Sequence, residues 1–307
     1  MTQEFKAVTL LGATGNLGPH ILSSLLRTGF EVTVLSRSQS SAASKLPSGV
    51  RVRQSDYSFA SLVEAFKGQD VVVSTISTLN VQQQLNIIDA AVAAKVKRFV
   101  PSEFGSDTSV DDEDDMATFI KEKKEVVRHL RTKEASGLSW TALCPGPWID
   151  WMLEEGNGLL GLDIKSKTAT IVDSGDQEFT GSTLGLVAKA TATILMRPEE
   201  TKNRYLQVQA FTLTQKSIIE AVERVTNTKF STKKISRAEL LSLAAKHLDE
   251  GDMARGQYEL VTATLCSGSK IVRFPERAVQ GNKVLGLAEE EDLEEMIKRV
   301  LAKLENI

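Results

Sequence analysis

The chain has 307 residues, 41% of them hydrophobic and 25% charged, so it can bury a large core as one big domain or one and a half. Its formal net charge of −3 excludes the basic surface that nucleic acid or an acidic membrane requires, and no stretch reaches the roughly 18 uncharged residues of a membrane-spanning helix. Two cysteines (Cys144 and Cys266) suggest no disulfide framework and three histidines show no metal-ligand spacing, so we expect a reducing, cytoplasmic setting and no metal site.

A glycine-rich segment near the N-terminus carries the first functional signal. Val8–Leu11 is a short apolar run suited to a strand buried on both faces, and the amphipathic stretch from Leu17 to Leu26 predicts a helix. Glycines between them let the backbone turn sharply towards an anion, to which the helix N-terminus presents free N–H groups. This order is typical of a dinucleotide-binding site, although a tight turn that merely packs helix on strand has the same composition. The candidate cofactor-binding residues of this turn are Gly12, Thr14, Gly15, Asn16, Leu17 and Gly18.

The first half of the chain alternates short apolar runs with helical patterns. The expected strands are residues 8–12, 31–36, 50–54, 70–74, 98–101 and 139–144. The expected helices are residues 17–27, 58–66, 81–94 and 116–135. This alternation predicts an α/β fold of the Rossmann type, a doubly wound parallel sheet with helices on both faces and right-handed crossovers. Ligands of such sheets bind beyond the carboxyl ends of the strands, so functional residues are expected to follow the strands.

Residues after the second and third expected strands indicate which dinucleotide binds. Arg37 lies about 20 residues past the glycine turn, where NAD-binding proteins carry an acid for the ribose hydroxyls. A guanidinium there suits a 2′-phosphate, with Lys45 as a second cation, although Arg37 can also be an ordinary exposed residue at a strand end. Asp56 is a candidate for the adenine amino group and equally a turn or N-cap residue ahead of Ser58.

Hydroxyl and aromatic residues follow the fourth and fifth expected strands. Ser74 and Thr75 are small enough to let a flat cofactor lie close to the backbone. Pro101, Phe104 and Gly105 lie so close together that they mark a shaped loop rather than a generic turn. The candidate cofactor-binding residues in these two segments are Ser74, Thr75, Ser102 and Phe104.

Two motifs together resemble a known family. Gly12-Ala-Thr-Gly-Asn-Leu-Gly and Arg98-Phe-Val-Pro-Ser-Glu-Phe-Gly are similar to the isoflavone-reductase-like, NmrA-like branch of the atypical short-chain dehydrogenases, which includes phenylcoumaran benzylic ether and pinoresinol–lariciresinol reductases. The likeness is continuous over roughly the first 150 residues. It implies an NADP(H)-binding Rossmann domain over residues 1–150 and a smaller α+β lobe over residues 151–307 that covers the substrate and is not cleanly separable. It also implies that Gln84 lies at the cofactor edge.

The same resemblance implies a single catalytic lysine at the start of the helix after that loop. In the family this lysine lies seven residues before an apolar helix position, and counting back from Leu130 gives Lys123. About three extra residues between Leu130 and Trp140 leave Lys124 as the second choice, and both lysines can equally belong to a solvated helix face. The tyrosine and lysine dyad of ordinary short-chain dehydrogenases is absent, since no tyrosine has a lysine four positions later. An ammonium can protonate the oxygen that gains charge when hydride adds to a conjugated or benzylic carbon.

Aromatic residues gather where the chain leaves the expected sheet. Trp148 and Trp151, with Phe104, can form a flat apolar wall for an aromatic substrate, or the core of a domain junction. Beyond them the sequence predicts short strands and helices but little chemistry. The expected strands there are residues 169–172 and 205–208, and the expected helices are residues 184–196, 217–225 and 288–304.

These observations lead to one main hypothesis and two alternatives. The main hypothesis is an NADP(H)-dependent oxidoreductase that reduces a small aromatic or conjugated substrate, with Lys123 as general acid or base. An NmrA-like regulator would instead sense the NADP(H) to NADP⁺ ratio through a partner protein without turnover. An epimerase or isomerase would need an acid–base residue on each face of the substrate, and only the lysine stands out.

Overall fold

The main sheet confirms the predicted doubly wound parallel architecture. The computed structural model describes residues 4–37, 46–77, 80–111, 117–156, 158–287 and 291–305. Seven strands lie in the order β10-β6-β5-β4-β1-β2-β3, and every neighbouring pair is parallel. Their bounds are Ala7–Leu11 (β1), Glu31–Arg37 (β2), Arg51–Ser55 (β3), Val71–Ser74 (β4), Arg98–Val100 (β5), Ser139–Cys144 (β6) and Arg204–Gln207 (β10).

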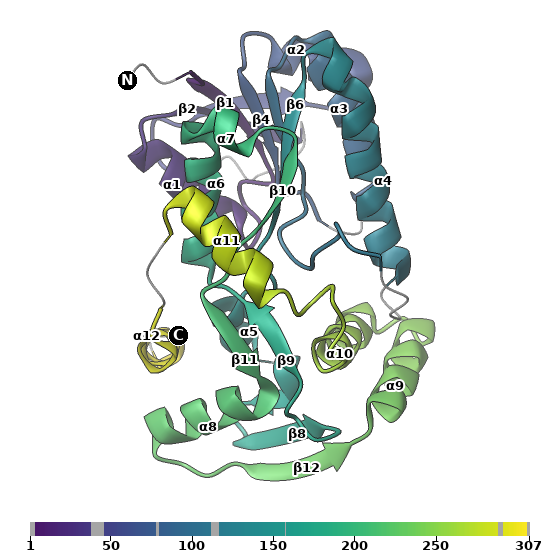
Figure 1. Ribbon diagram of the computed structural model, residues 1–307, viewed down its shortest axis with the longest axis vertical. Coiled ribbons are helices and arrows are strands. Elements are labelled where there is room, and N and C mark those ends of the chain that lie inside the picture. Colours follow the sequence, from purple (N-terminus) through teal and green to yellow (C-terminus); the bar gives the residue numbers. More distant parts are fainter. Residues whose placement is uncertain are drawn as a thin grey trace.

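Helices cover both faces of this sheet (Figure 1). They are α1 (Gly18–Arg27) and α6 (Leu184–Met196) on one face, and α2 (Phe59–Phe66), α3 (Gln83–Ala93) and α4 (Ala117–Lys133) on the other. The central strands are mostly apolar because they are buried on both sides. In β4, Val71 and Val73 join the core under α1 and α6, whereas Val72 joins the core under α2, α3 and α4.

Residues after 150 add one strand and one helix to the main sheet. Strand β10 pairs in parallel with β6, and α6 packs against α1, although both elements come from residues after 150. The division at residue 150 stays a prediction, and the structure adds that residues 184–207 belong spatially to the main sheet. The sequence pattern predicted a strand at residues 205–208, but not its place at the edge of this sheet.

The rest of the chain forms a lobe beyond the carboxyl ends of the strands (Figure 1). It contains a two-stranded sheet, β11-β9, and a three-stranded sheet, β12-β8-β7. Its strands are Leu162–Asp163 (β7), Thr168–Val172 (β8), Glu178–Gly181 (β9), Phe211–Thr214 (β11) and Ser231–Ile235 (β12). Its helices are Ile149–Glu155 (α5), Gln215–Thr226 (α8), Arg237–Asp249 (α9), Met253–Leu265 (α10) and Leu293–Glu305 (α12). Two further helices lie against the main sheet (Figure 1), Pro198–Thr201 (α7) directly after α6 and Pro275–Leu285 (α11) on β10. No sequence pattern had predicted β9, β11, α5, α10 or α11.

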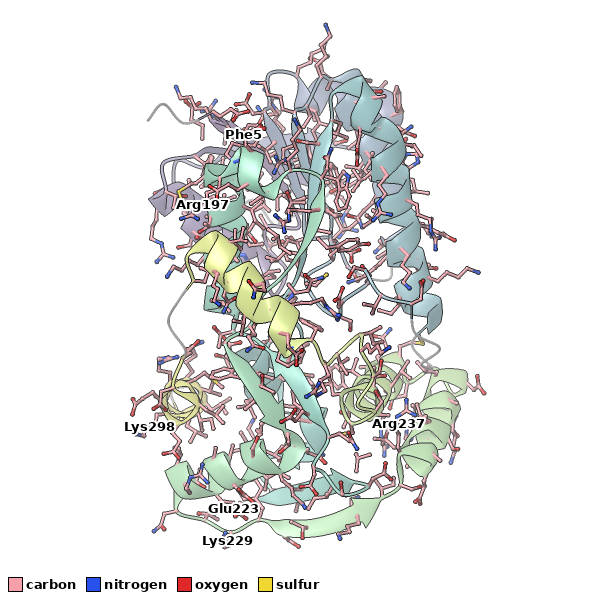
Figure 2. The ribbon with its side chains drawn as sticks, viewed as in Figure 1. Phe5, Arg197, Glu223, Lys229, Arg237 and Lys298 are labelled. Carbon is pink, nitrogen blue, oxygen red and sulfur yellow. The ribbon has the colours of Figure 1, made fainter. Side chains whose placement is uncertain are left out.

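Specific contacts hold α11 against the main sheet. A Cβ on Gly281 would lie 1.8 Å from the Gln207 carbonyl oxygen, so α11 lies directly on β10. Arg197, labelled near one end of α11 in Figure 2, donates from Nη1 to the Val284 carbonyl at 2.7 Å. None of the helices in the described ranges is long and apolar enough to cross a membrane.

A buried arginine ties β5 to β6 and to the segment after α6. Arg98 is 1% exposed, and it donates to the hydroxyls of Ser139 (2.7 Å) and Thr201 (3.0 Å) and to the Pro198 carbonyl (2.6 Å). Burial lowers the pKa of its guanidinium to about 10. Its guanidinium also lies 5.4 Å from the centre of the Phe5 ring, which Figure 2 labels near the sheet. These bonds satisfy the buried charge and fix the strand that precedes the Pro-Ser-Glu-Phe-Gly loop.

Candidate functional site

The glycine turn has the geometry of an anion site. Gly12 has φ +79°, and a Cβ there would lie 2.5 Å from the Thr75 carbonyl oxygen. A Cβ on Gly18 would lie 2.1 Å from the Gly12 carbonyl oxygen, whereas one on Gly15 would meet nothing nearer than 3.5 Å. Glycine is therefore required at Gly12 and Gly18 for close backbone approach, and Gly15 serves the turn through its N–H bond to the Gly12 carbonyl (3.0 Å).

The turn before α1, rather than the first turn of the helix itself, supplies backbone donors, because Pro19 has no N–H and the His20 amide donates to the Leu17 carbonyl at 3.1 Å. Leu17 occupies the N-cap position without a side-chain cap hydrogen bond, and the first turn has no acidic residue. Thr14, Gly15 and Asn16 are exposed, so an anion can reach the amides. The Leu17 side chain is 4% exposed and packs in the core, which leaves only its backbone to face a ligand.

Two residues predicted to bind the cofactor, Arg37 at the 2′-phosphate and Asp56 at the adenine, lie at the ends of adjacent strands. Arg37 is the last residue of β2, pairs in register with Ser55 at the end of β3, and is exposed. Asp56 follows β3, and its Oδ1 accepts a 2.9 Å hydrogen bond from the Ser58 amide, which forms a turn before α2. Hydrogen bonding from the Ser58 side chain, and then from its amide, lowers the pKa of Asp56. This turn is one of the two roles that the sequence left open for Asp56, and the adenine role stays a prediction. Lys45 lies outside the described residues.

Polar side chains join the segments that follow β4 and β5. Gln84 is fully buried, and its Oε1 accepts a 2.8 Å hydrogen bond from the Ser102 amide. The Ser102 hydroxyl donates to the Ile76 carbonyl at 2.8 Å, and the Thr75 hydroxyl donates to the Leu11 carbonyl at 2.7 Å. Gln84 Nε2 and the buried Ser74 hydroxyl have no hydrogen-bond partner among the described residues. A buried donor without a partner is costly, so these two groups are available to a ligand at this edge.

The structure turns Lys123 inward and Lys124 away. Lys123 is 7% exposed, and its Nζ donates to the Glu103 carbonyl at 2.5 Å. Lys124 Nζ instead binds the Val110 carbonyl (2.5 Å) and the exposed Asp111 carboxylate (2.9 Å). Lys123 and the buried Leu130 are seven residues apart and share one helix face. Burial lowers the pKa of Lys123, and the Glu103 charge opposes this shift.

A cluster of buried polar residues around Lys123 was not predicted from the sequence. Glu103 is fully buried, its carboxylate accepts a hydrogen bond from Thr108, and burial raises its pKa while the Lys123 charge opposes that shift. Tyr205 of β10 lies beyond Thr108, and burial raises the pKa of the nearby Cys144 thiol well above its ordinary value. The Pro-Ser-Glu-Phe-Gly motif contains Glu103 but gave it no role, and no local signal could bring Tyr205 to it.

The aromatic residues predicted to form a substrate wall pack partly into the hydrophobic core. Trp148 and Trp151 pack edge to face with ring centres 5.8 Å apart, and both rest partly buried on the main core. Phe104 is 6% exposed, has φ +22° and belongs to the same core. Core packing does not explain the Trp148 indole N–H, which is buried without a hydrogen-bond partner among the described residues.

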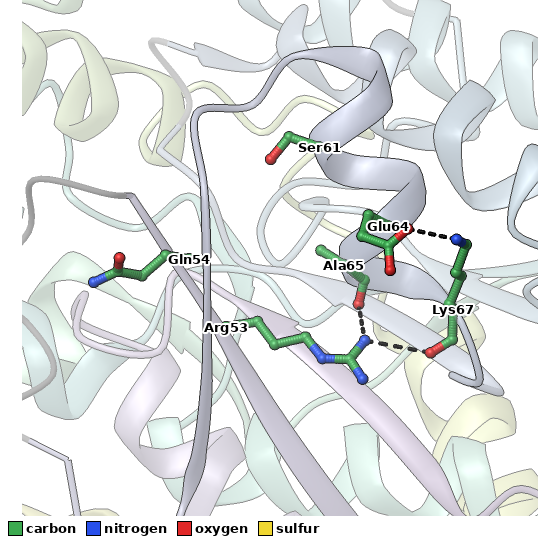
Figure 3. A pocket seen from close by; sticks show the side chains of 6 residues that line it. All are labelled: Arg53, Gln54, Ser61, Glu64, Ala65 and Lys67. Atoms are coloured by element: carbon green, nitrogen blue, oxygen red, sulfur yellow. Dashed lines mark hydrogen bonds and ion pairs between the residues drawn. The ribbon is translucent and has the colours of Figure 1, made fainter.

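A separate pocket of about 410 Å³ lies between β3 and the end of α2 (Figure 3). Arg53 Nη1 donates to the carbonyls of Ala65 (2.5 Å) and Lys67 (3.3 Å), and Lys67 Nζ pairs with Glu64 at 2.5 Å. Because α2 ends just before β4 begins, this pocket lies towards the amino ends of the strands, away from the glycine turn. Lys67 and Glu64 are paired with each other and Arg53 is held by main-chain carbonyls, so we do not place the chemistry here.

Comparisons with known proteins relate this arrangement to reductases. The model of the NmrA-like family matches residues 4–147. The oxidoreductase aprR of Aspergillus flavus is 39% identical over 248 residues, which cover 80% of this chain and 82% of the relative. The isoflavone reductase homolog IRL of Zea mays is 30% identical over 241 residues, 75% of this chain and 77% of the relative. The solved structure of AtPrR2 with NADP⁺ and (+)pinoresinol has a TM-score of 0.74 and 25% identity, covering 97% of this chain and 99% of that one.

Proposed function

This chain belongs to the NmrA-like family and is an oxidoreductase, and from this premise we propose that it is an NADP(H)-dependent reductase of a small aromatic or conjugated substrate. The observation that carries the proposal is the inward-facing Lys123, buried beside the loop after β5. The Ser102 hydroxyl of the same loop donates to the Ile76 carbonyl in the segment after β4. The similar structure with bound NADP⁺ and pinoresinol supports both the cofactor and the substrate class.

The residues present fit this cofactor. The close approach at Gly12 and Gly18 and the uncapped N-terminus of α1 suit a pyrophosphate. The exposed guanidinium of Arg37 suits a 2′-phosphate, because it can donate two hydrogen bonds to one phosphate group. Gln84 Nε2 and the Ser74 hydroxyl offer buried donors at the same edge of the sheet.

Lys123 is proposed to hold and deliver the proton. When bound, the cofactor supplies the hydride. The Lys123 ammonium then donates a proton to the substrate oxygen on which negative charge develops. Burial lowers the pKa of Lys123, which makes the ammonium a stronger acid, while the Glu103 carbonyl orients it at 2.5 Å. Exclusion of water strengthens the attraction between the Lys123 ammonium and the negative charge that develops on the substrate oxygen. Charges interact more strongly in a medium of low dielectric constant.

Support for an aromatic substrate comes from the segment after β6. The rings of Trp148 and Trp151 are partly buried and pack edge to face. In such a pair the face of one ring stays open as a flat apolar surface. The buried Trp148 indole N–H can donate to a substrate oxygen. A relative named isoflavone reductase homolog agrees with such a substrate.

The decisive experiment separates turnover from binding alone. Purified protein is titrated with NADPH in a calorimeter and then incubated with NADPH and a panel of isoflavones, lignans and conjugated ketones, with nicotinamide absorbance as the readout. We expect tight NADPH binding and consumption with at least one aromatic compound. Binding without any consumption, together with cofactor-dependent capture of a partner protein, would favour the regulator that senses NADP(H).

A further inference from the structure

A second surface pocket lies between α4, the segment after β5 and the edge strand β10, and the proposed reaction does not use it. Its volume is about 180 Å³. Sites for drug-sized molecules begin at roughly 300 Å³, so this pocket suits a small ion or a single group of a larger ligand. The charges and hydrogen-bond donors of its lining indicate which ion or group that is.

The charges that line this pocket are unbalanced. Lys124, Arg128 and Arg131 line it from α4, whereas the lining residues that the structure describes include a single acid, Asp111. The three cations are four and three residues apart, so they share one face of the helix, where like charges repel one another. Two positive charges remain in excess, and a phosphate group on an organic molecule carries about −1.5 to −2 near neutral pH.

The acidic residues best placed to neutralise the two arginines bind elsewhere. Glu125, three residues before Arg128, accepts a 2.9 Å hydrogen bond from the glutamine side chain just before α3. Glu134, three residues after Arg131, accepts a 2.7 Å hydrogen bond from the Trp140 indole N–H. Within the described part of the chain, neither arginine has an ion pair or a side-chain hydrogen bond. A guanidinium has five N–H donors, so both arginines can donate to a ligand in the pocket.

Aromatic packing supports two of the side chains that line the pocket. The Arg131 guanidinium lies over the Trp140 ring, 5.7 Å from its centre. Tyr205 packs edge to face against the same ring, with ring centres 5.6 Å apart. Trp140 is 2% exposed, so the ring that supports both side chains is itself held in the core. A guanidinium held in this way loses less side-chain entropy when it binds an anion.

This pocket is separate from the proposed cofactor site. Arg37, the candidate for the 2′-phosphate, ends β2, whereas Tyr205 lies in β10. Four strands lie between β2 and β10, and neighbouring strands are about 4.8 Å apart, so roughly 24 Å separates the two. On α4, Lys124 lines the pocket, whereas Lys123 is buried against the Glu103 carbonyl. A ligand in the pocket is therefore additional to the proposed cofactor and substrate.

We propose that this pocket binds a phosphate group, either as inorganic phosphate or as part of a small phosphorylated metabolite. Arg128 and Arg131 donate charge-assisted hydrogen bonds to its oxygens. The Tyr205 hydroxyl supplies another donor, because burial raises its pKa and keeps it protonated. Lys124 contributes charge rather than a direct bond, since its Nζ already binds the Val110 carbonyl and the carboxylate of the next residue.

The test uses the whole protein without cofactor or substrate, and inorganic phosphate is the probe. The arginine side-chain N–H signals are followed by ¹⁵N NMR while phosphate replaces chloride at constant ionic strength. The signals are assigned by their loss in Arg128→Gln and Arg131→Gln. We expect both signals to shift saturably in the wild-type protein, with a Kd of about 1 mM or lower. Each substitution should weaken the affinity by about tenfold or more, because hydrogen bonds to a charged group are lost.

Two further variants distinguish a specific site from general attraction of an anion to surface charge. Arg27→Gln removes an exposed arginine from the last turn of α1, outside the pocket, and should leave the Kd unchanged. Asp111→Asn removes the acid from the described lining and should tighten binding by about two- to fivefold. A gain in affinity cannot come from misfolding, so Asp111→Asn decides the matter if either pocket arginine variant is unstable.

Three results would overturn the proposal. They are the absence of saturation below about 10 mM phosphate, a wild-type Kd in both Arg128→Gln and Arg131→Gln, and displacement of phosphate by NADPH, which would make the pocket part of the cofactor site. The same titration with glycerol 3-phosphate identifies the source of the phosphate group. Tighter binding than that of inorganic phosphate supports a phosphorylated metabolite, and weaker binding supports the free ion. No step of this test depends on turnover, so it stands whether or not the proposed reductase activity is found.

Discussion

The glycine turn and the Lys123 cluster lie at the carboxyl ends of the same sheet, yet they are built in opposite ways. The turn consists of consecutive residues, Gly12 to Gly18, and offers exposed backbone N–H groups. The cluster joins Glu103, Lys123 and the half-buried Tyr205 from three distant segments, and it buries the side chains of Glu103 and Lys123. One site depends on the conformation of a short peptide, and the other depends on the whole fold.

This difference determines how each site can fail. Exposed amides at a helix end cost little when empty, because water satisfies them. A buried ammonium beside a buried carboxyl group is costly unless each has a partner, so the fold must hold their geometry closely. Damage to the turn should therefore weaken cofactor binding through sterics, whereas damage to the cluster should alter chemistry while binding persists.

The sharpest test of this contrast is Lys123→Met. Removal of the ammonium takes away the proposed acid, so we expect turnover to fall by about 100- to 10,000-fold while calorimetric NADPH affinity stays within about threefold. Lys124→Met is the matched control, because Lys124 binds the Val110 carbonyl and Asp111 on the surface, and it should keep its rate.

The pH dependence of the wild-type rate belongs to the same test. Burial lowers the Lys123 pKa from its ordinary value of 10.5, and the ammonium is the active form. The rate should therefore fall as pH rises through a value below 10.5. If the rate falls only at or above pH 10.5, or if Lys123→Met keeps full activity, Lys123 is not the acid.

Gly18→Ala tests the turn by sterics. The new Cβ would lie 2.1 Å from the Gly12 carbonyl oxygen, so the backbone must move, and we expect the free energy of unfolding to fall by about 1–3 kcal/mol with a loss of NADPH affinity. Gly185→Ala, in the first turn of α6, is the control, since its nearest neighbour lies at 3.9 Å. That control should be neutral or up to about 1 kcal/mol more stable. Equal effects of the two changes in thermal and denaturant unfolding would refute the close-approach argument.

Arg37→Ala tests the cofactor choice. Loss of hydrogen bonds to a charged phosphate is worth about 1.5–3 kcal/mol, so the preference for NADPH over NADH should fall by roughly ten- to a hundredfold in binding assays. Arg51→Ala is a suitable control, because Arg51 is also exposed but pairs with Glu31 at 2.5 Å near the other end of β2. An unchanged preference in Arg37→Ala would remove Arg37 from the phosphate site.

The smallest effect is expected at Asp70, far from both sites. Burial pushes its pKa up, but hydrogen bonds from Lys97 and the Ala7 and Lys6 amides outweigh this and leave it lowered below 3.8. A lowered carboxyl pKa stabilises the fold above 3.8, and this contribution is lost as pH falls through the lowered value. Asp70→Asn should lower the free energy of unfolding by about 1 kcal/mol or less at neutral pH and make it depend less on pH in acid. Asp176→Asn should have a smaller effect, because the Asp176 carboxylate pairs with Lys216 in full contact with solvent.

Much of the main sheet follows from local pattern. The runs at 8–12, 31–36 and 70–74 become β1, β2 and β4 because apolar strands buried on both faces carry a strong signal, and the glycine turn follows from backbone sterics at Gly12 and Gly18. The helix expected over 288–304 is shorter, beginning at Leu293. Strands β9 (Glu-Phe-Thr-Gly) and β11 (Phe-Thr-Leu-Thr) were missed because these short segments contain only one and two large apolar residues, unlike the three valines of β4.

By itself, the sequence determined the parallel sheet and the glycine turn between its first strand and first helix, since each depends on residues close together in the chain. The choice of Lys123 came from the family resemblance and left Lys124 as the alternative. Only the tertiary structure decided that Lys123 faces inward and Lys124 does not, that β10 returns to the edge of the sheet, and that Tyr205 thereby reaches Thr108 and Glu103. The physical reason is that burial and hydrogen bonding between distant segments are properties of packing, which no local pattern of residues records.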